Sequence, residues 1–141
     1  IERRLDERGT TDAKSTAKKI AALKPTIDRV ISSPAMRTQS TARWLMQELS
    51  LSRLKLHFEE RIYDADRATL IEVIRHIPDD CENVALIGHN PGISRLARWA
   101  CDDDELNEFE PGDALMLKTD LDHWVNTSKG CFDILKKVSP R

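Results

Sequence analysis

The chain has 141 residues, with 22 basic and 24 acidic side chains and a formal net charge of −2. This length suits one domain with one hydrophobic core, and we expect a single domain over residues 1–141. The balanced charge gives no reason to expect nucleic acid or a membrane as a partner, and no apolar run could span a bilayer. Three distant cysteines without a C-x-x-C pair are typical of reduced thiols in a cytoplasmic protein.

Hydrophobic periodicity predicts an alternation of helices and strands along the chain. Helical spacing of apolar residues predicts helices over 10–25, which Thr10 would cap, and over 34–50, 68–77 and 93–101. Short β-branched or alternating runs predict strands over 28–32, 54–59, 83–88, 114–120 and 131–138. The strand at 83–88 is almost continuously apolar, as in a sheet covered on both faces. The expected fold is a three-layer α/β/α sandwich with a mainly parallel central sheet.

Two stretches, "VISSPAMR" and "LIGHNPGIS", repeat one pattern of strand, capping residue, proline and helix. Ser33 and Asn90 are the expected N-caps, each followed by a proline at the first helical position. Parallel strands end at the same edge of a sheet, so the two helix N-termini should meet there. Helix N-termini carry free N–H groups and partial positive charge, which predicts an anion site for a group such as phosphate.

Arg37 and His89 are the side chains that fit such a site. Arg37 falls in the first turn of its predicted helix, where a positive charge opposes the helix dipole unless an anion compensates. Its guanidinium can bind phosphate oxygens in bidentate fashion. His89 follows its strand directly and can donate a hydrogen bond or transfer a proton. The alternative for each residue is an ordinary role, a solvated arginine and a structural histidine.

The chain resembles the histidine phosphatase superfamily (phosphoglycerate mutase-like), and within it the SixA-type phosphohistidine phosphatase branch. The resemblance rests on "DERG", "VISSPAMRTQSTA", "FEERIYDA", "ALIGHNPGIS" and the ending from "PGDALMLKTD", in order over nearly the whole chain. It implies a phosphoglycerate mutase-like fold and a phosphatase that forms a phosphohistidine intermediate. No metal-ligand pattern is present in the sequence, and we expect no cofactor.

The resemblance also implies roles for four residues. Arg37 matches the second arginine of the family's phosphate pocket, and His89 matches its second histidine. The backbone N–H of Asn90 is expected to meet the phosphate. Glu60 matches an acidic position that acts as a general acid or positions water. The predicted catalytic residues are therefore His89, Arg37 and Glu60, and the predicted phosphate ligands are Arg37, His89 and Asn90.

The family's nucleophilic histidine has no match in this sequence. It follows the first strand in an R-H-G or R-H-A motif, which would precede Ile1. The Arg75-His76 pair ends a helical pattern instead, and neither His57 nor His123 follows an apolar strand. We expect the first strand and the nucleophile to lie upstream of Ile1. The alternative is a truncated relative without them.

Spacing bears on the substrate. Arg37 and Glu60 are 23 positions apart, and Glu60 and Gly88 are 28 apart, which leaves little room for a lid over a small substrate. An open pocket suits phosphohistidine on a protein such as a phosphotransfer domain. The alternatives are a small-molecule phosphomonoesterase and a non-catalytic phosphate-binding or adaptor protein. Arg4 or Arg8 could line the pocket rim, or both could form surface ion pairs.

Overall fold

The computed structural model describes residues 7–141, so the predicted rim residue Arg4 lies outside the described residues. The helices are α1 (Glu7–Ala22), α2 (Met36–Glu48), α3 (Arg67–Arg75) and α4 (Gly92–Cys101). The strands are β1 (Arg29–Ser32), β2 (Leu56–Phe58), β3 (Val84–Ile87), β4 (Ala114–Thr119) and β5 (Phe132–Val138). Short 3₁₀ turns occupy η1 (Arg53–Lys55), η2 (Glu60–Ile62) and η3 (Trp124–Asn126). The predicted alternation of helices and strands is confirmed.

Three parallel strands form the central sheet, in the order β2-β1-β3. Ser32 at the end of β1 pairs with Phe58 of β2 and with Ile87 of β3, so the three strands end together. The strands β4 and β5 form a separate antiparallel hairpin with a register shift after Met116. Within residues 7–141, β3 pairs with β1 alone.

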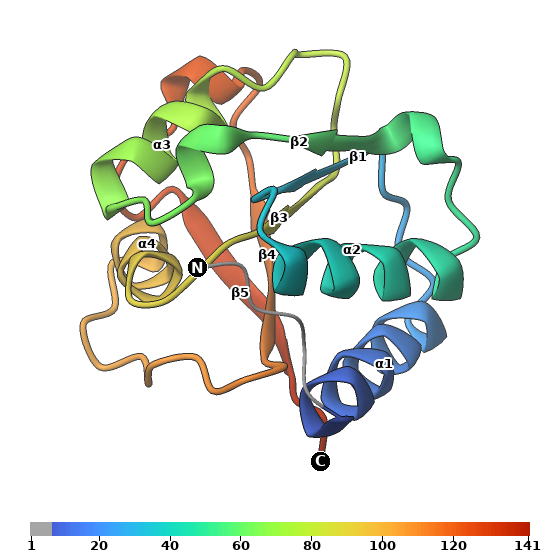
Figure 1. Cartoon of the computed structure of the whole chain (residues 1–141). Coiled ribbons are helices and arrows are strands. Elements are labelled where there is room, and N and C mark those ends of the chain that lie inside the picture. The colour runs from blue at the N-terminus through green and yellow to red at the C-terminus, as the bar shows by residue number, and fades with distance from the viewer. Residues whose placement is uncertain (1–6) are drawn as a thin grey trace.

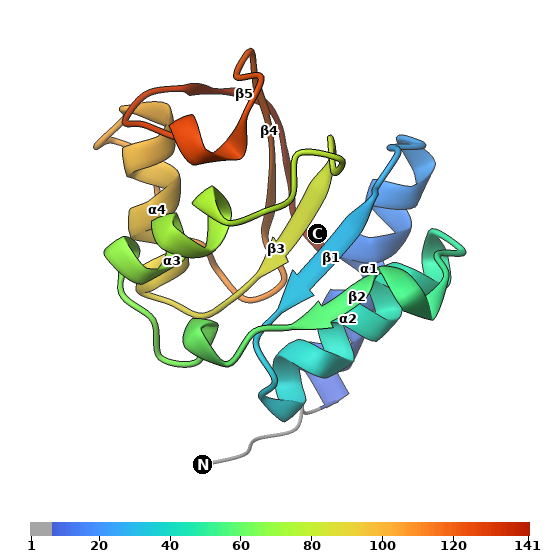
Figure 2. The same ribbon diagram turned by 90° about the horizontal axis from the view of Figure 1, so that it is seen from above.

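Helices cover both faces of the central sheet, which confirms the three-layer arrangement (Figures 1 and 2). Successive residues of β1 point to opposite faces. Val30 packs against Ala42 and Met46 of α2, whereas Ile31 belongs to the cluster built by α3 and α4. Helix α1 lies against α2, outside the sheet. The fold is thus mixed α/β with a parallel central sheet, as predicted.

The strand β3 is less buried than its apolar sequence predicts. All four of its residues are partly exposed. Its side chains do contact both layers, with Ala85 and Ile87 on the α2 side and Val84 and Leu86 on the α3 side. The exposure has a simple cause, because one edge of β3 has no hydrogen-bonded strand among the described residues.

The predicted helix starts differ from the observed ones by one to three residues. Helix α1 begins at Glu7, ahead of the predicted cap Thr10. Ala35 occupies the cap position of α2 and Pro91 that of α4, and neither provides a side-chain cap. The predicted caps, Ser33 and Asn90, precede these cap positions in the chain, and their side chains bind other partners, described below. The Asn90–Pro91 peptide bond is cis.

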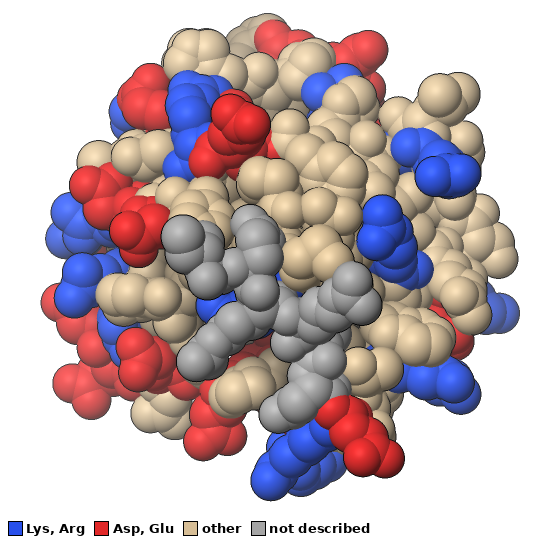
Figure 3. All heavy atoms as spheres, viewed as in Figure 1, with Lys and Arg blue, Asp and Glu red and all other residues tan. Residues whose placement is uncertain are grey.

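No helix in residues 7–141 is long and apolar enough to cross a membrane. Acidic and basic side chains are interspersed over the face of the molecule shown in Figure 3. Basic residues stand at separate places on this face and do not merge into one patch. This distribution agrees with the balanced net charge of the sequence.

Candidate anion-binding site

The segments that follow β1, β2 and β3 adjoin at one edge of the sheet. The backbone N–H of Ser33 donates to the carbonyl oxygen of Ile87 at 3.1 Å, and the N–H of Glu59 donates to that of Ser32 at 2.9 Å. These bonds continue the strand pairing by one residue beyond β1 and beyond β2. As a result, the residues after β1 lie beside those after β3, as the repeated sequence pattern predicted.

Ser33 is fully buried at the centre of this edge. Its Oγ accepts a hydrogen bond from the N–H of Ala35 at 3.3 Å and lies 2.8 Å from Nε2 of His89. Its carbonyl oxygen accepts a hydrogen bond from Oγ1 of Thr38 at 2.9 Å. Ser33 therefore links the end of β1, the first turn of α2 and the imidazole of His89.

His89 is held on several sides. Its Nδ1 lies 3.5 Å from Nη2 of Arg37, on the side of the ring opposite Ser33. The edge of the Tyr63 ring contacts the imidazole, with centroids 5.7 Å apart and planes at 72°. The backbone carbonyl of His89 accepts the N–H of Ile93 at 2.9 Å. These contacts hold the imidazole ring just beyond the end of β3, where the residue is partly exposed.

Arg37 extends from the first turn of α2 and is exposed. The structure therefore brings Arg37 and His89 together, although they are 52 positions apart in the chain. A guanidinium and an imidazole side by side offer several N–H donors to one oxyanion. The arrangement suits a phosphate-sized anion.

The side chain of Asn90 is committed to a neighbouring loop. Its Nδ2 donates to the carbonyl oxygen of Phe109 at 2.7 Å, and its Oδ1 accepts from Oγ of Ser94 at 2.6 Å. Ser94 is 1 % exposed and in turn accepts the N–H of Phe109 at 2.9 Å. Asn90 thus ties the loop before β4 to the first turn of α4, which explains why it does not cap the helix.

Gly92 allows α4 to approach the rest of the site. A Cβ at this position would collide with the carbonyl oxygen of Ala65 and crowd Leu70 of α3. The glycine is required by this close approach, because backbone atoms cannot move aside as a flexible side chain can. It therefore sets how near the start of α4 lies to the turn that carries Tyr63.

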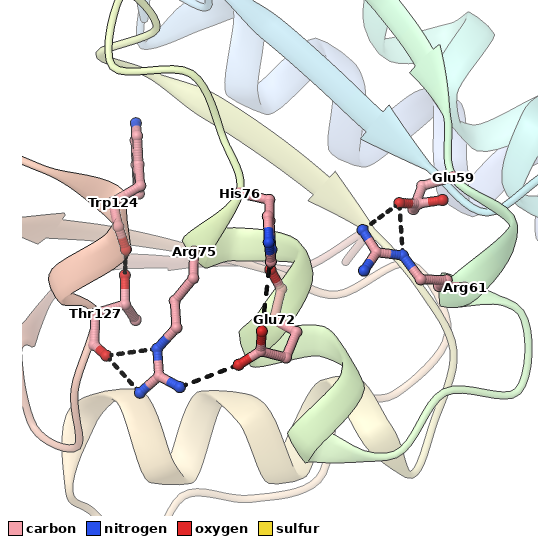
Figure 4. Close-up of polar contacts among 7 residues, drawn as sticks. All are labelled: Glu59, Arg61, Glu72, Arg75, His76, Trp124 and Thr127. Carbon is pink, nitrogen blue, oxygen red and sulfur yellow. Dashed lines mark hydrogen bonds and ion pairs between the residues drawn. The ribbon is translucent and has the colours of Figure 1, made fainter.

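Glu60 begins η2 and is exposed. In the described part of the chain its carboxylate is not among the hydrogen bonds that join Ser33, His89 and Arg37. The neighbouring Glu59 binds Arg61, with Oε1 2.6 Å from Nη2 and 2.9 Å from Nε (Figure 4). This hydrogen bonding by Arg61 lowers the pKa of Glu59. Glu59 therefore stays ionised and neutralised by Arg61.

The other histidines lie outside the site. His76 follows the last residue of α3, and its Nδ1 donates to the carbonyl of Glu72 at 2.7 Å (Figure 4). His123 pairs with Asp79 at 2.8 Å, and its hydrogen bond lowers the pKa of Asp79. His57 is exposed in the middle of β2. These positions agree with the sequence analysis, which did not place any of the three as the nucleophile.

Arg75, the other half of the Arg-His pair, has a structural partner. Its Nη2 and Nε donate to the carbonyl oxygen of Thr127 at 2.9 and 3.1 Å (Figure 4). This contact attaches η3 to the end of α3. Arg8, a predicted rim residue, lies 4.0 Å from Asp12 in an ion pair on α1. Both arginines therefore have partners away from the Arg37–His89 cluster.

Sequence reasoning missed two contacts of His89. Ser33 was predicted to cap a helix, yet its hydroxyl meets the imidazole. Tyr63 lies in the "FEERIYDA" segment, where only Glu60 was assigned a role. The signal for Ser33 was its place beside a parallel strand end, but the direction of its side chain depends on the tertiary structure. Among residues 7–141, no group of three or more His, Cys, Asp or Glu side chains could hold a metal ion.

No protein-family model matches the chain. An uncharacterized protein of Mycobacterium leprae is 32% identical over 98 residues, which are 68% of this chain and 56% of that protein. The chain thus spans little more than half the length of that relative. An uncharacterized protein of Mycobacterium tuberculosis is 25% identical over 148 aligned positions, covering 99% of this chain and 90% of that protein.

Solved structures give a closer comparison of the fold. SixA from Nakamurella multipartitia superposes with a TM-score of 0.82 at 20% identity, over 96% of this chain and 84% of that one. SixA from Agrobacterium tumefaciens superposes with a TM-score of 0.80 at 19% identity, over 96% of this chain and 82% of that one. The protein histidine phosphatase SixA complexed with tungstate superposes with a TM-score of 0.82 at 18% identity, over 99% of this chain and 85% of that one. The chain has the SixA fold. The resemblance inferred from the sequence is confirmed at the level of the fold.

Proposed function

We propose that this chain is a phosphatase of the SixA type, which removes a phosphoryl group from phosphohistidine on a protein. The observation that carries the proposal is the meeting of Arg37 and His89, with Nη2 and Nδ1 3.5 Å apart, at the end of parallel strands. Phosphoryl transfer depends mainly on charge neutralisation and positioning, which such donors supply. One SixA structure is a complex with tungstate, a tetrahedral oxyanion like phosphate.

The proposed reaction has two steps. A nucleophilic imidazole attacks phosphorus, the bond from phosphorus to the substrate nitrogen breaks, and that nitrogen takes a proton from Glu60 or water. Water then attacks the phosphorus atom, the bond from phosphorus to the enzyme's imidazole nitrogen breaks, and inorganic phosphate leaves. The proton that water loses goes to the Glu60 carboxylate or to solvent. Arg37, His89 and the N–H of Asn90 bind the phosphoryl oxygens in both steps. Glu60 is exposed at the start of η2 and can exchange protons with solvent.

We place the nucleophile on a segment preceding Ile1. The described residues hold one histidine at the site, His89, and its imidazole is engaged by Ser33 and Arg37. The edge of β3 that faces away from β1 has no strand partner in residues 7–141, so it can pair with a further strand. A strand parallel to β3 would end beside His89 and deliver a side chain to the anion.

An open site favours a substrate carried on a protein. Between β2 and β3 the chain forms only η2, α3 and short connections, and between β1 and β2 only α2 and η1. None of these elements is an insertion that would close over a small molecule. Phosphohistidine exposed on a phosphotransfer domain could reach Arg37 without a lid having to open.

The proposal is tested by phosphate release from a phosphohistidine protein and from p-nitrophenyl phosphate. We expect the chain preceded by its natural upstream segment to hydrolyse the former faster. Replacing His89 by Ala should lower the rate by about a hundredfold, as expected for a group that stabilises transferring charge. His123→Ala is the matched control, because His123 is exposed and pairs with Asp79 away from the site.

Mapping the phosphorylated residue of a trapped intermediate identifies the nucleophile. Phosphate on His89 would overturn the assignment of the nucleophile to an upstream segment. Saturable phosphate binding without turnover, even with the upstream segment present, would favour the non-catalytic adaptor. Faster turnover of small phosphomonoesters than of phosphohistidine would favour a small-molecule phosphatase.

A further inference from the structure

Ser33 and His89 share a hydrogen bond whose direction can be worked out from donor and acceptor counts. The Oγ of Ser33 and Nε2 of His89 are 2.8 Å apart, a short and well-formed contact. A neutral imidazole carries one N–H and one acceptor nitrogen, so the direction of this bond decides which nitrogen holds the proton. The same choice decides what His89 presents to an anion beside Arg37.

The hydroxyl hydrogen of Ser33 needs an acceptor inside the protein. Ser33 is 0 % exposed, and a buried donor without a partner carries a desolvation penalty. Its Oγ already accepts the N–H of Ala35 at 3.3 Å, and that contact leaves the hydrogen unused. Among the bonds of Oγ within residues 7–141, Nε2 of His89 is the partner able to accept it.

The contact on the opposite side of the ring favours the other tautomer, but it is the weaker of the two. Arg37 can only donate, so a bond from its Nη2 to Nδ1 would require Nδ1 to be unprotonated. That distance is 3.5 Å, at the outer limit for a hydrogen bond, whereas the Ser33 contact is 0.7 Å shorter (3.5 − 2.8). The shorter bond to the buried hydroxyl should dominate the choice of tautomer.

We propose that Ser33 is a positioning residue that holds neutral His89 in the tautomer with the proton on Nδ1. Two donors, Nδ1–H of His89 and Nη2–H of Arg37, then lie side by side. They cannot bond to each other, but they can both donate to one oxygen of a phosphoryl group. The edge contact of Tyr63 keeps the ring plane in place while Ser33 fixes the proton.

The tautomer can be read directly from the ¹⁵N shifts and ring couplings of His89. The measurement is repeated at rising pH until the ¹⁵N shifts stop changing, so that it reports the neutral ring. We expect the Nδ1–H form in the wild-type chain and a shift toward Nε2–H in Ser33→Ala. Ser32→Ala is the matched control, because Ser32 is equally buried but its hydroxyl donates to the carbonyl of Ser33.

Binding of inorganic phosphate gives the functional readout, and only this part rests on the proposed function. We expect Ser33→Ala to bind phosphate about tenfold more weakly, as for one misplaced hydrogen bond, and Ser32→Ala to stay within about twofold. An Nε2–H tautomer in the wild-type chain would overturn the proposal, and this measurement decides even if Ser33→Ala fails to fold. Equal effects of the two variants on tautomer and binding would also overturn it.

The two proposals fail separately. An Nδ1–H tautomer without any phosphate affinity would overturn the proposed function but would agree with the proposed hydrogen bond from Ser33 to His89.

Discussion

Arg37 is exposed in the first turn of α2, and its guanidinium reaches Nδ1 of His89 from outside the hydrophobic core. A cation at the N-terminal end of a helix lowers helix stability by roughly 0.3 kcal/mol unless an anion lies near it. This placement is compatible with the proposed role of Arg37 in anion binding and adds no stability to the helix. Binding and folding should therefore separate at this residue.

We predict that Arg37→Ala weakens phosphate binding and lowers kcat/KM by about 10- to 100-fold, because hydrogen bonds to charged groups contribute about 1.5–3 kcal/mol. The melting temperature should change little. Arg43→Ala is the control, since Arg43 is also exposed on α2. Titration calorimetry and thermal melting check the two parts. A loss of stability with unchanged phosphate affinity would show that Arg37 is structural.

At the scale of elements, Asp28 holds β1 and β3 in register from the end opposite the site. Its Oδ2 accepts the N–H groups of Glu82 and Asn83, each at 2.8 Å. Its own N–H donates to the carbonyl oxygen of Asn83 at 2.8 Å. These bonds precede the first pair of the β1–β3 ladder, Arg29 with Val84. They therefore influence where both strands end, and hence where Ser33 meets His89.

The two backbone hydrogen bonds lower the pKa of Asp28 below its ordinary value of 3.8. A lowered folded-state pKa means that the ionised form stabilises the fold above the unfolded pKa, and that this stabilisation is lost as pH falls through the folded value. We predict that Asp28→Asn lowers the free energy of unfolding by about 1 kcal/mol at pH 7. The difference from wild type should shrink below about pH 4.

Urea unfolding at several pH values checks this prediction. Glu82→Gln is the control, because Glu82 is exposed beside the same loop and bonds to Asp28 through its backbone. A stability difference that stays constant down to about pH 2 would contradict the charge-based account.

Over the whole molecule, the C-terminal segment fastens α1 to the rest of the chain. Nη2 of Arg141 contacts both carboxylate oxygens of Asp12 at 3.1 Å, and Asp12 is 8 % exposed. Three α1 side chains donate to carbonyl oxygens of later segments: Ser15 to Pro140, Thr16 to Gly112 and Lys19 to Ser139. The C-terminus accordingly lies beside α1 (Figure 1). Polar contacts thus supplement the packing of α1 on α2.

We predict that Arg141→Ala lowers the free energy of unfolding by about 1–2 kcal/mol, because Asp12 would keep a largely buried carboxylate with a weaker partner. Amide exchange should increase in α1 more than in α3. Arg141→Lys, which keeps the charge and loses the planar fork, should fall between wild type and alanine. Equal exchange in α1 of all three proteins would contradict the anchoring role.

The sequence by itself determined the order and type of the elements. It also indicated that the ends of β1 and β3 lie at the same edge of the sheet. Helical and strand periods are local properties, and each strong pattern in this chain gave the expected element. The repeat of strand, proline and helix placed Arg37 and His89 at one edge, because parallel neighbouring strands must end together. Neither step required knowledge of side-chain directions.

Tertiary structure decided what those side chains touch. The hydroxyl of Ser33 and the amide of Asn90 have the chemistry of helix caps, and only the packed neighbours show that they bind His89 and Phe109 instead. The contact of Tyr63 with His89 joins residues 26 positions apart (89 − 63). The partial exposure of β3 likewise depends on which strands pair beside it. The local sequence shows which hydrogen bonds a side chain is able to form. Long-range packing decides which of them form, because a partner must lie within about 3 Å.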